Sequence, residues 1–274
     1  MNILTDVHTH TTFSPDGKSD VYEMLAKAKA LQLGYWGISE HFDYDYYADN
    51  IPFDGGPARF TDAETYFSVA RKLQAEENEV HVLVGGEFGF SRNEKTADYY
   101  NALVKRYRPD FIVNSVHTQG TADYYDRTPF FGKDKRAAYK EYFALVRDSL
   151  EAKYPYDIVG HIGYAARYAP YPDKEPTYEE FKDEIDDILS AVIRKGKILE
   201  ANSSAKGLKT PFLPSVDILQ RYFELGGRKV SFASDAHDAG RLAAGRDAVI
   251  AALKKIGFTD LTVPCCGKEI KIKI

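Results

Sequence analysis

The sequence has very few cysteines, and this scarcity excludes a disulfide-based framework. Its only two cysteines, Cys265 and Cys266, are adjacent near the C-terminus, and no C-x-x-C pair occurs. Neighbouring cysteines rarely form a disulfide with each other, so both thiols are expected to have structural roles.

Long apolar runs and basic clusters are also missing. No apolar run approaches the roughly 20 residues of a membrane span, and the chain begins without the charged-then-apolar leader of a secretory signal. Lys and Arg together number 36 against 41 Asp and Glu, giving a formal net charge of −5, and no cluster of them indicates a basic face. We therefore expect a cytoplasmic protein that binds neither membrane nor nucleic acid, while a few local cations still allow a small anionic substrate.

Short β-rich runs alternate with longer amphipathic segments along all 274 residues, without repeats or a linker. The strands are predicted at 3–8, 35–40, 80–87, 111–117, 157–161, 197–202 and 229–235. The helices are predicted at 19–33, 61–78, 95–107, 134–153, 177–195, 214–226 and 243–256. A final hairpin is expected from 261–263, Gly267 and 270–274. This α/β rhythm, with 44% hydrophobic residues, predicts one domain over residues 1–274 with a parallel sheet and outer helices.

Either a closed barrel or a doubly wound open sheet would give that rhythm. The barrel is favoured because polar residues end nearly every predicted strand, and barrel enzymes build their sites at the C-terminal strand ends. Seven units instead of eight predict a distorted (β/α)7 TIM-like barrel. The long loops at 42–60 and 162–176 follow strand ends and are expected to line the site.

The first strand ends in the pattern Asp6-x-His8-x-His10. Side chains alternate between the faces of a strand, so these three point the same way. Two imidazoles and a carboxylate suit a divalent metal. Alone, this pattern fits equally well a polar strand end with two solvated histidines.

The distribution of the other histidines favours the metal interpretation. Six of the seven histidines fall at the C-terminal end of a predicted strand, and only His81 falls at a strand start. Six imidazoles at one barrel mouth would be costly to desolvate and would repel one another if protonated, whereas divalent cations take them neutral. A Ser–His–Asp triad needs one histidine, and no G-x-S-x-G pattern is present. Nine side chains at this rim suit two or three cations: His8, His10, Asp16, His41, Glu87, His117, His161, Asp235 and His237.

These blocks together resemble the polymerase and histidinol phosphatase (PHP) family. The matching segments are 6–10 (DVHTH), 86–87 (GE), 115–117 (SVH) and 234–237 (SDAH), with 39–41 (SEH) and 159–161 (VGH) in the right order. The segment 11–17 (TTFSPDG) is similar to the histidinol-phosphatase branch. Residues 118–123 (TQGTAD) depart from that branch, which often has an aromatic residue in this loop.

The resemblance implies a site for three divalent ions, which could be zinc, iron or manganese. His8, His10, Glu87 and Asp235 would hold the first ion, and Glu87 would bridge to a second ion held by His117 and His161. Asp16, His41 and His237 would hold the third. Asp6 is expected not to bind an ion itself but to orient a residue that does.

A metal-bridged water, acting as hydroxide, would then attack phosphorus in line. Glu87, Asp235 and His237 are the expected catalytic residues, and a bound water, Asp235 or His237 would protonate the leaving oxygen. Arg167, which resembles an arginine of this branch, and Lys209 are the expected substrate-binding cations, each against the alternative of a solvated surface charge. Arg241 and Arg246 are interpreted as surface charges at a helix start.

The resemblance implies a phosphomonoesterase that releases inorganic phosphate from L-histidinol phosphate in histidine biosynthesis. A second hypothesis is a PHP phosphatase for another small phosphoester, such as a nucleotide or phosphotyrosine. Tyr44, Tyr46 and Tyr47 are expected either to shape the leaving-group pocket or to pack in a surface loop. A third is a non-catalytic module that binds metal or a small anion, although every expected ligand position is filled.

Overall fold

The structure is a computed structural model that describes residues 4–45 and 61–274. Its strands are β1 (Leu4–Asp6), β2 (Leu33–Ile38), β3 (His41–Phe42), β4 (His81–Val84), β5 (Gly86–Gly89), β6 (Ile112–Ser115), β7 (Thr118–Gln119), β8 (Ala122–Asp123), β9 (Ile158–Val159), β10 (Ile198–Asn202), β11 (Val230–Ala233), β12 (Asp260–Cys265) and β13 (Lys268–Lys273). Its α-helices are α1 (Val21–Ala30), α3 (Ala63–Glu76), α4 (Glu94–Tyr107), α5 (Lys135–Ser149), α6 (Lys182–Arg194), α7 (Val216–Glu224) and α8 (Arg246–Ile256). Among these described residues, no helix is long and apolar enough to cross a membrane.

Parallel strands form the centre of the molecule in the orders β1-β2-β4 and β11-β10-β9-β6-β5-β3. The chain runs directly from β2 toward β3 and from β4 into β5, so each of these pairs is one interrupted barrel strand. The first and last strands then meet: the Asp235 N–H donates to the His8 carbonyl at 3.0 Å, and the His10 N–H donates to the Ala236 carbonyl at 2.8 Å. This closure favours the seven-stranded barrel over the open sheet.

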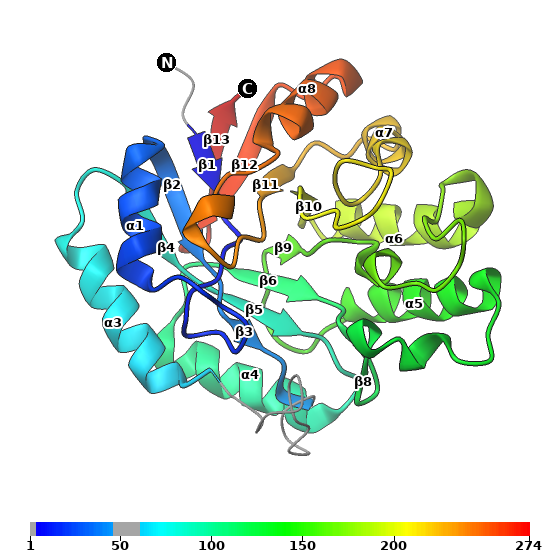
Figure 1. Ribbon diagram of the computed structural model, residues 1–274, viewed down its shortest axis with the longest axis horizontal. Helices are drawn as coiled ribbons and strands as arrows, with labels where there is room; N and C mark the ends of the chain where they lie inside the picture. Colours follow the sequence, from blue (N-terminus) through cyan, green and yellow to red (C-terminus); the bar gives the residue numbers. More distant parts are fainter. Residues whose placement is uncertain (1–3, 46–60) are drawn as a thin grey trace.

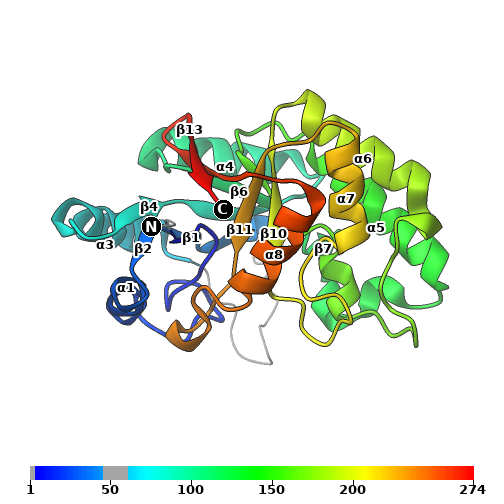
Figure 2. The same ribbon diagram turned by 90° about the horizontal axis from the view of Figure 1, so that it is seen from above.

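Helices surround the strands, with α1 and α3 at one end of the molecule and α5, α6 and α7 at the other (Figures 1 and 2). Aspartates cap two of these helices. Asp20 caps α1 in a reciprocal capping box with Glu23, and Asp62 caps α3. A carboxylate next to the first helical N–H groups satisfies donors that the helix itself cannot.

Large side chains are buried among the strands. Trp36 is fully buried, and its indole N–H donates to Thr9 Oγ1 at 2.9 Å. Phe111 packs so closely against Gly85 that a Cβ there would lie 2.5 Å from the ring. Strands buried on both faces need near-continuous apolar sequence, which explains the short β-rich runs in the sequence.

The predicted elements are confirmed. All seven helices and all seven barrel strands lie within or close to their predicted ranges, and β12 and β13 form the expected antiparallel hairpin, with Asp260 opposite Lys273. Both cysteines are free thiols. Residues 46–60, most of the loop expected at 42–60, lie outside the described residues.

Candidate metal centre

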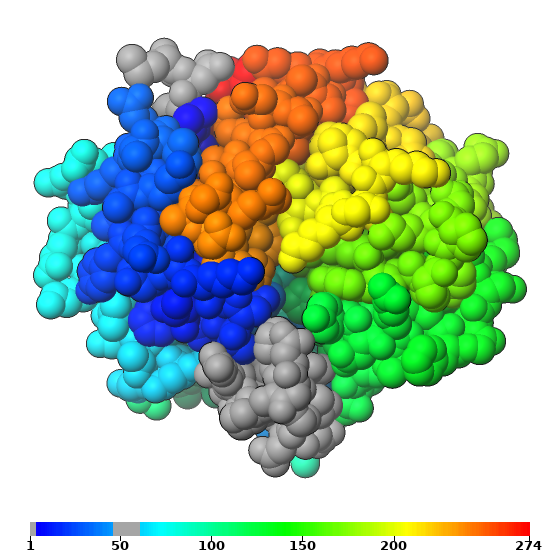
Figure 3. Space-filling view, viewed as in Figure 1, coloured from blue at the N-terminus to red at the C-terminus, as the bar shows by residue number. Residues whose placement is uncertain are grey.

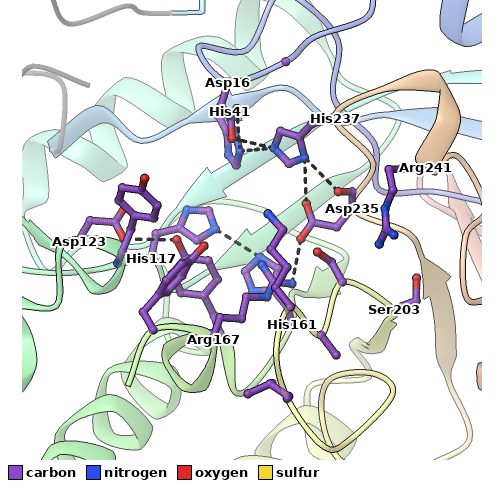
Figure 4. Close-up of a pocket in the computed structure, with 18 of the residues that line it drawn as sticks. Asp16, His41, His117, Asp123, His161, Arg167, Ser203, Asp235, His237 and Arg241 are labelled. Carbon is purple, nitrogen blue, oxygen red and sulfur yellow. Dashed lines mark hydrogen bonds and ion pairs between the residues drawn. The ribbon is translucent and has the colours of Figure 1, made fainter. Parts of the chain in front are cut away.

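A cavity of about 1120 Å³ opens at the C-terminal ends of the barrel strands. The molecular surface is hollowed where the blue N-terminal segment meets the green, yellow and orange segments (Figure 3). Side chains from separate strands point into this hollow (Figure 4). The residues that line it include His41, His117, His161, Asp235 and His237.

Glu87 lies at the centre of the cluster, fully buried on β5. Its Oε2 is 2.8 Å from His41 Nδ1, 3.3 Å from His8 Nε2 and 3.5 Å from His10 Nε2. His10 Nε2 is also 3.5 Å from Asp235 Oδ1. Three imidazoles therefore converge on one carboxylate oxygen.

The other oxygen of Glu87 faces a second pair of imidazoles. Its Oε1 is 2.9 Å from His161 Nε2 and 3.1 Å from His117 Nε2, and it accepts a hydrogen bond from Ser115 Oγ at 2.6 Å. Burial raises the pKa of Glu87, but the surrounding imidazoles, with His8 first, lower it well below its ordinary value. The carboxylate is thus held ionised between two groups of nitrogen ligands.

A third group lies beside the first. His237 Nε2 is 2.9 Å from Asp16 Oδ2, His41 Nε2 is 3.6 Å from Asp16 Oδ1, and the two imidazole nitrogens are 3.4 Å apart. The loop that presents Asp16 is tight, since a Cβ at Gly17 would lie 1.7 Å from the Thr11 carbonyl oxygen. Glycine is therefore required next to Asp16.

Several of these ligand atoms are buried without a hydrogen-bond partner among the described residues: His8 Nε2, His10 Nε2, Asp16 Oδ1, His41 Nδ1 and Glu87 Oε2. Buried polar atoms are costly when they are left unpaired. Atoms that share an ion about 2.1 Å away are separated by roughly 3.0–3.4 Å, close to the spacings observed here. Three overlapping groups have geometry that could hold an ion: His10 with His41 and His237, His8 with His10 and Glu87, and His41 with Glu87 and His117. The residues fit a site for divalent metal.

Asp235 follows β11 in an unusual backbone conformation. Its φ is 53°, in the left-handed region that few residues other than glycine adopt. Its Oδ2 accepts a hydrogen bond from Arg167 at 3.0 Å, and Arg167 also donates to Asn202 Oδ1 at 3.1 Å. Such local strain is typical of functional positions.

Two carboxylates that sequence reasoning missed orient the imidazoles. Glu200 Oε1 lies 2.6 Å from His8 Nδ1, and its Oε2 accepts the His161 backbone N–H at 2.7 Å. Asp43 Oδ1 lies 2.9 Å from His117 Nδ1. A carboxylate accepts the Nδ1 proton, so Nε2 of each ring is left to face Glu87. The signals were present: Glu200 lies in a buried strand, and Asp43 follows His41 by two residues.

Asp6 has the supporting role expected of it. Its two oxygens accept the backbone N–H groups of Ser234, at 3.0 Å, and Ala243, at 2.8 Å. Because Ser234 precedes Asp235, Asp6 fixes the backbone that presents this ligand candidate. Burial raises the pKa of Asp6 to about 6.

The two predicted substrate cations differ in position. Arg167 is buried and lines the cavity, as do Tyr164 and Tyr168 of the loop at 162–176. Lys209 lies outside the lining: its side chain is 81% exposed and pairs with Asp173 at 3.3 Å. Sequence position alone did not show which lysine after β10 lines the cavity.

Three other cations line the cavity, and all three have exposed side chains. They are Lys18, Lys206, three residues before Lys209 in the same stretch, and Arg241, whose exposure agrees with the surface charge expected there. Of the three tyrosines considered for the pocket, Tyr44 stacks on Tyr99 at 4.6 Å, and positions 46 and 47 are outside the described residues.

The fold and the site define a candidate metal-dependent hydrolase built on a seven-stranded barrel. The model of the PHP domain matches residues 6–204, so the chain belongs to the PHP family.

Two curated relatives have similar length. "Probable histidinol-phosphatase" of Clostridium acetobutylicum is 30% identical over 236 residues, covering 86% of this chain and 87% of the relative. "Histidinol-phosphatase" of Lactococcus lactis is 30% identical over 259 residues, covering 93% and 92%.

Solved structures agree with this assignment. The crystal structure of histidinol phosphate phosphatase from Lactococcus lactis, complexed with zinc, L-histidinol and phosphate, has a TM-score of 0.85 at 28% identity and covers 98% of this chain and 99% of that one. A putative histidinol phosphatase from Listeria monocytogenes has a TM-score of 0.71 at 23% identity, covering 89% of this chain and 99% of that one, and supports the fold alone.

Proposed function

We propose that this protein is a metal-dependent phosphomonoesterase that hydrolyses L-histidinol phosphate to L-histidinol and phosphate. The observation that carries the proposal is the convergence of five imidazoles on Glu87 at the barrel mouth, in a chain similar over nearly its whole length to a phosphatase solved with zinc, L-histidinol and phosphate. The proposal includes a role in histidine biosynthesis, a cytoplasmic location and a single domain over residues 1–274.

The proposed ligand set comprises three groups that share Glu87 or border it. His8, His10, Glu87 and Asp235 would form the first, Glu87 with His117 and His161 the second, and Asp16 with His41 and His237 the third. Zinc, iron and manganese all accept such nitrogen and oxygen ligands. Divalent metal bound there supplies Lewis acidity and lowers the pKa of coordinated water.

The remaining residues of the site bind and orient the substrate. Arg167 brings a buried positive charge to the cavity, and Lys18, Lys206 and Arg241 add three more at its lining, which favours a phosphate dianion. Asp235 and His237 lie close together, with His237 Nδ1 3.0 Å from the Asp235 carbonyl oxygen. They are the two side-chain candidates for giving a proton to the leaving oxygen.

The direct test is a steady-state assay of the metal-loaded protein. We expect kcat/KM for L-histidinol phosphate to exceed that for p-nitrophenyl phosphate by about a hundredfold, since specific contacts to the leaving group contribute only with the true substrate. Equal values for the two substrates would remove the assignment to histidine biosynthesis. A nucleotide or phosphotyrosine preferred over L-histidinol phosphate would support the second hypothesis, a PHP phosphatase for another small phosphoester.

A further inference from the structure

Besides Asp238, one acidic side chain that lines the cavity lies outside the proposed metal groups and their supporting carboxylates. Asp123, at the end of β8, lines the cavity beside His117, whereas Arg241 lies on the opposite side (Figure 4). It belongs to the loop after β6, where the sequence departs from the histidinol-phosphatase branch. Asp123 and Arg241 therefore lie on opposite sides of the candidate metal centre, although Asp235 and Asp238 add carboxylates close to Arg241.

Among the described residues, the Asp123 carboxylate has hydrogen-bond donors but no ion-pair partner. Its Oδ1 accepts the Tyr125 backbone N–H at 2.7 Å and the Tyr164 hydroxyl at 3.3 Å. Within residues 4–45 and 61–274, no Lys, Arg or His forms an ion pair with it. Burial raises its pKa to about 6. A half-buried carboxylate without an ion-pair partner is favoured by a cation that pairs with it.

Aromatic rings surround this carboxylate. The Tyr164 ring lies 4.9 Å from the His117 ring and 5.3 Å from the Tyr168 ring, and Tyr125 packs edge-on against Tyr168 at 5.3 Å. All three tyrosines line the cavity. Aromatic faces near a carboxylate favour an organic cation, through cation–π attraction and a charge-assisted hydrogen bond. The Arg167 guanidinium already lies 5.3 Å from the centroid of the Tyr164 ring, so Tyr164 contributes its hydroxyl, which orients Asp123.

We propose that Asp123, with Tyr164 and Tyr168, forms a subsite for the ammonium group of the leaving alcohol and so determines substrate specificity. This inference rests on the proposed phosphatase function and adds the selection of an amino-alcohol phosphoester. A second phosphate or carboxylate at this position would meet the Asp123 charge, so the subsite disfavours nucleoside diphosphates and acidic phosphopeptides.

The test compares pairs of phosphoesters in which only one member carries an ammonium group. The metal-loaded wild type and Asp123→Asn are assayed on L-histidinol phosphate, on its N-acetyl derivative, and on the pair 4-aminobutyl phosphate and butyl phosphate. For Asp123→Asn we expect kcat/KM to fall about 10- to 100-fold on the two amines, mainly through KM, and to change less than about 2-fold on the two compounds that lack an ammonium group. Calorimetric titration with L-histidinol should show a parallel loss of affinity.

Two matched variants complete the design. Asp126→Asn removes a neighbouring exposed charge from the same turn and should leave the amine preference unchanged. Asp123→Glu should restore part of the preference. An equal loss of kcat/KM on substrates with and without an ammonium group, in an Asp123→Asn variant that melts like the wild type, would overturn the proposal. Asp123 would then be a support for His117. Because the aminobutyl and butyl pair does not depend on histidinol, its result stands even if L-histidinol phosphate proves a poor substrate.

Discussion

Both ends of the barrel contain buried carboxylates, but Asp110 at one end has donors for both of its oxygens, whereas Glu87 at the other has an oxygen without a donor. At the N-terminal end, Asp110 accepts hydrogen bonds from Arg71 at 2.7 Å, Gln74 at 2.7 Å and the Val84 N–H at 2.8 Å. At the C-terminal end, Glu87 Oε2 has no hydrogen-bond donor and faces three imidazoles. A closed polar network stabilises a fold, whereas a buried network with unpaired atoms is the arrangement expected where a ligand completes it.

Glu87→Ala should give the largest effect, because it removes the group that both nitrogen clusters share. We expect kcat on L-histidinol phosphate to fall about a thousandfold or more, with cooperative unfolding retained. Activity and thermal melting are measured on the same preparation. If the wild type is inactive and Glu87→Ala fails to fold, the result would favour the non-catalytic binding module, in which the site only stabilises the barrel.

Metal removal tests the C-terminal end of the barrel without a mutation. Chelation should abolish activity and lower Tm, since a ligand that binds only the folded state stabilises it. Adding back zinc, iron or manganese singly should restore both, and elemental analysis of the reloaded protein gives the number of ions. Full activity after exhaustive dialysis against chelator, with no metal detected, would contradict the proposed site.

Glu200→Gln should have an intermediate effect, because Glu200 orients His8 and His161 without facing the cavity itself. We expect about a 10- to 100-fold loss of metal affinity, measured by competition with a chromophoric chelator. Activity at saturating metal should recover most of its wild-type value. A variant with unchanged metal affinity would show that the Glu200 contacts are structural only.

Asp110→Asn should produce the opposite pattern at the other end of the barrel. The amide keeps the size of the carboxylate but cannot accept from every donor now bound, so the free energy of unfolding should fall by about 1–3 kcal/mol. Activity per folded, metal-loaded molecule should be unchanged. Urea denaturation measures the first quantity, and a changed kcat would show that the two ends are coupled.

The sequence predicted the barrel and the cluster because both depend on local patterns. Strand period, helix caps and the position of histidines at strand ends can be recognised in single segments, and the nine predicted ligand candidates do gather at one rim. Asp43, Glu200 and Asp123 escaped prediction because their roles depend on which strands become neighbours. The choice between Lys206 and Lys209 depends on the course of one loop, for which the sequence contains no periodic signal.

The two lysines provide the smallest and most local prediction. Lys209→Ala removes an exposed pair with Asp173, and such pairs contribute little, so kcat/KM should change less than about 2-fold. Lys206→Ala removes a positive charge from the cavity lining and should raise KM for any phosphomonoester by about 3- to 10-fold, with kcat little changed. Increasing salt should weaken the difference between these variants, because a partly solvated cation is screened. A larger effect of Lys209→Ala than of Lys206→Ala would show that Lys209 binds the substrate. The loop after β10 would then have to rearrange when substrate binds.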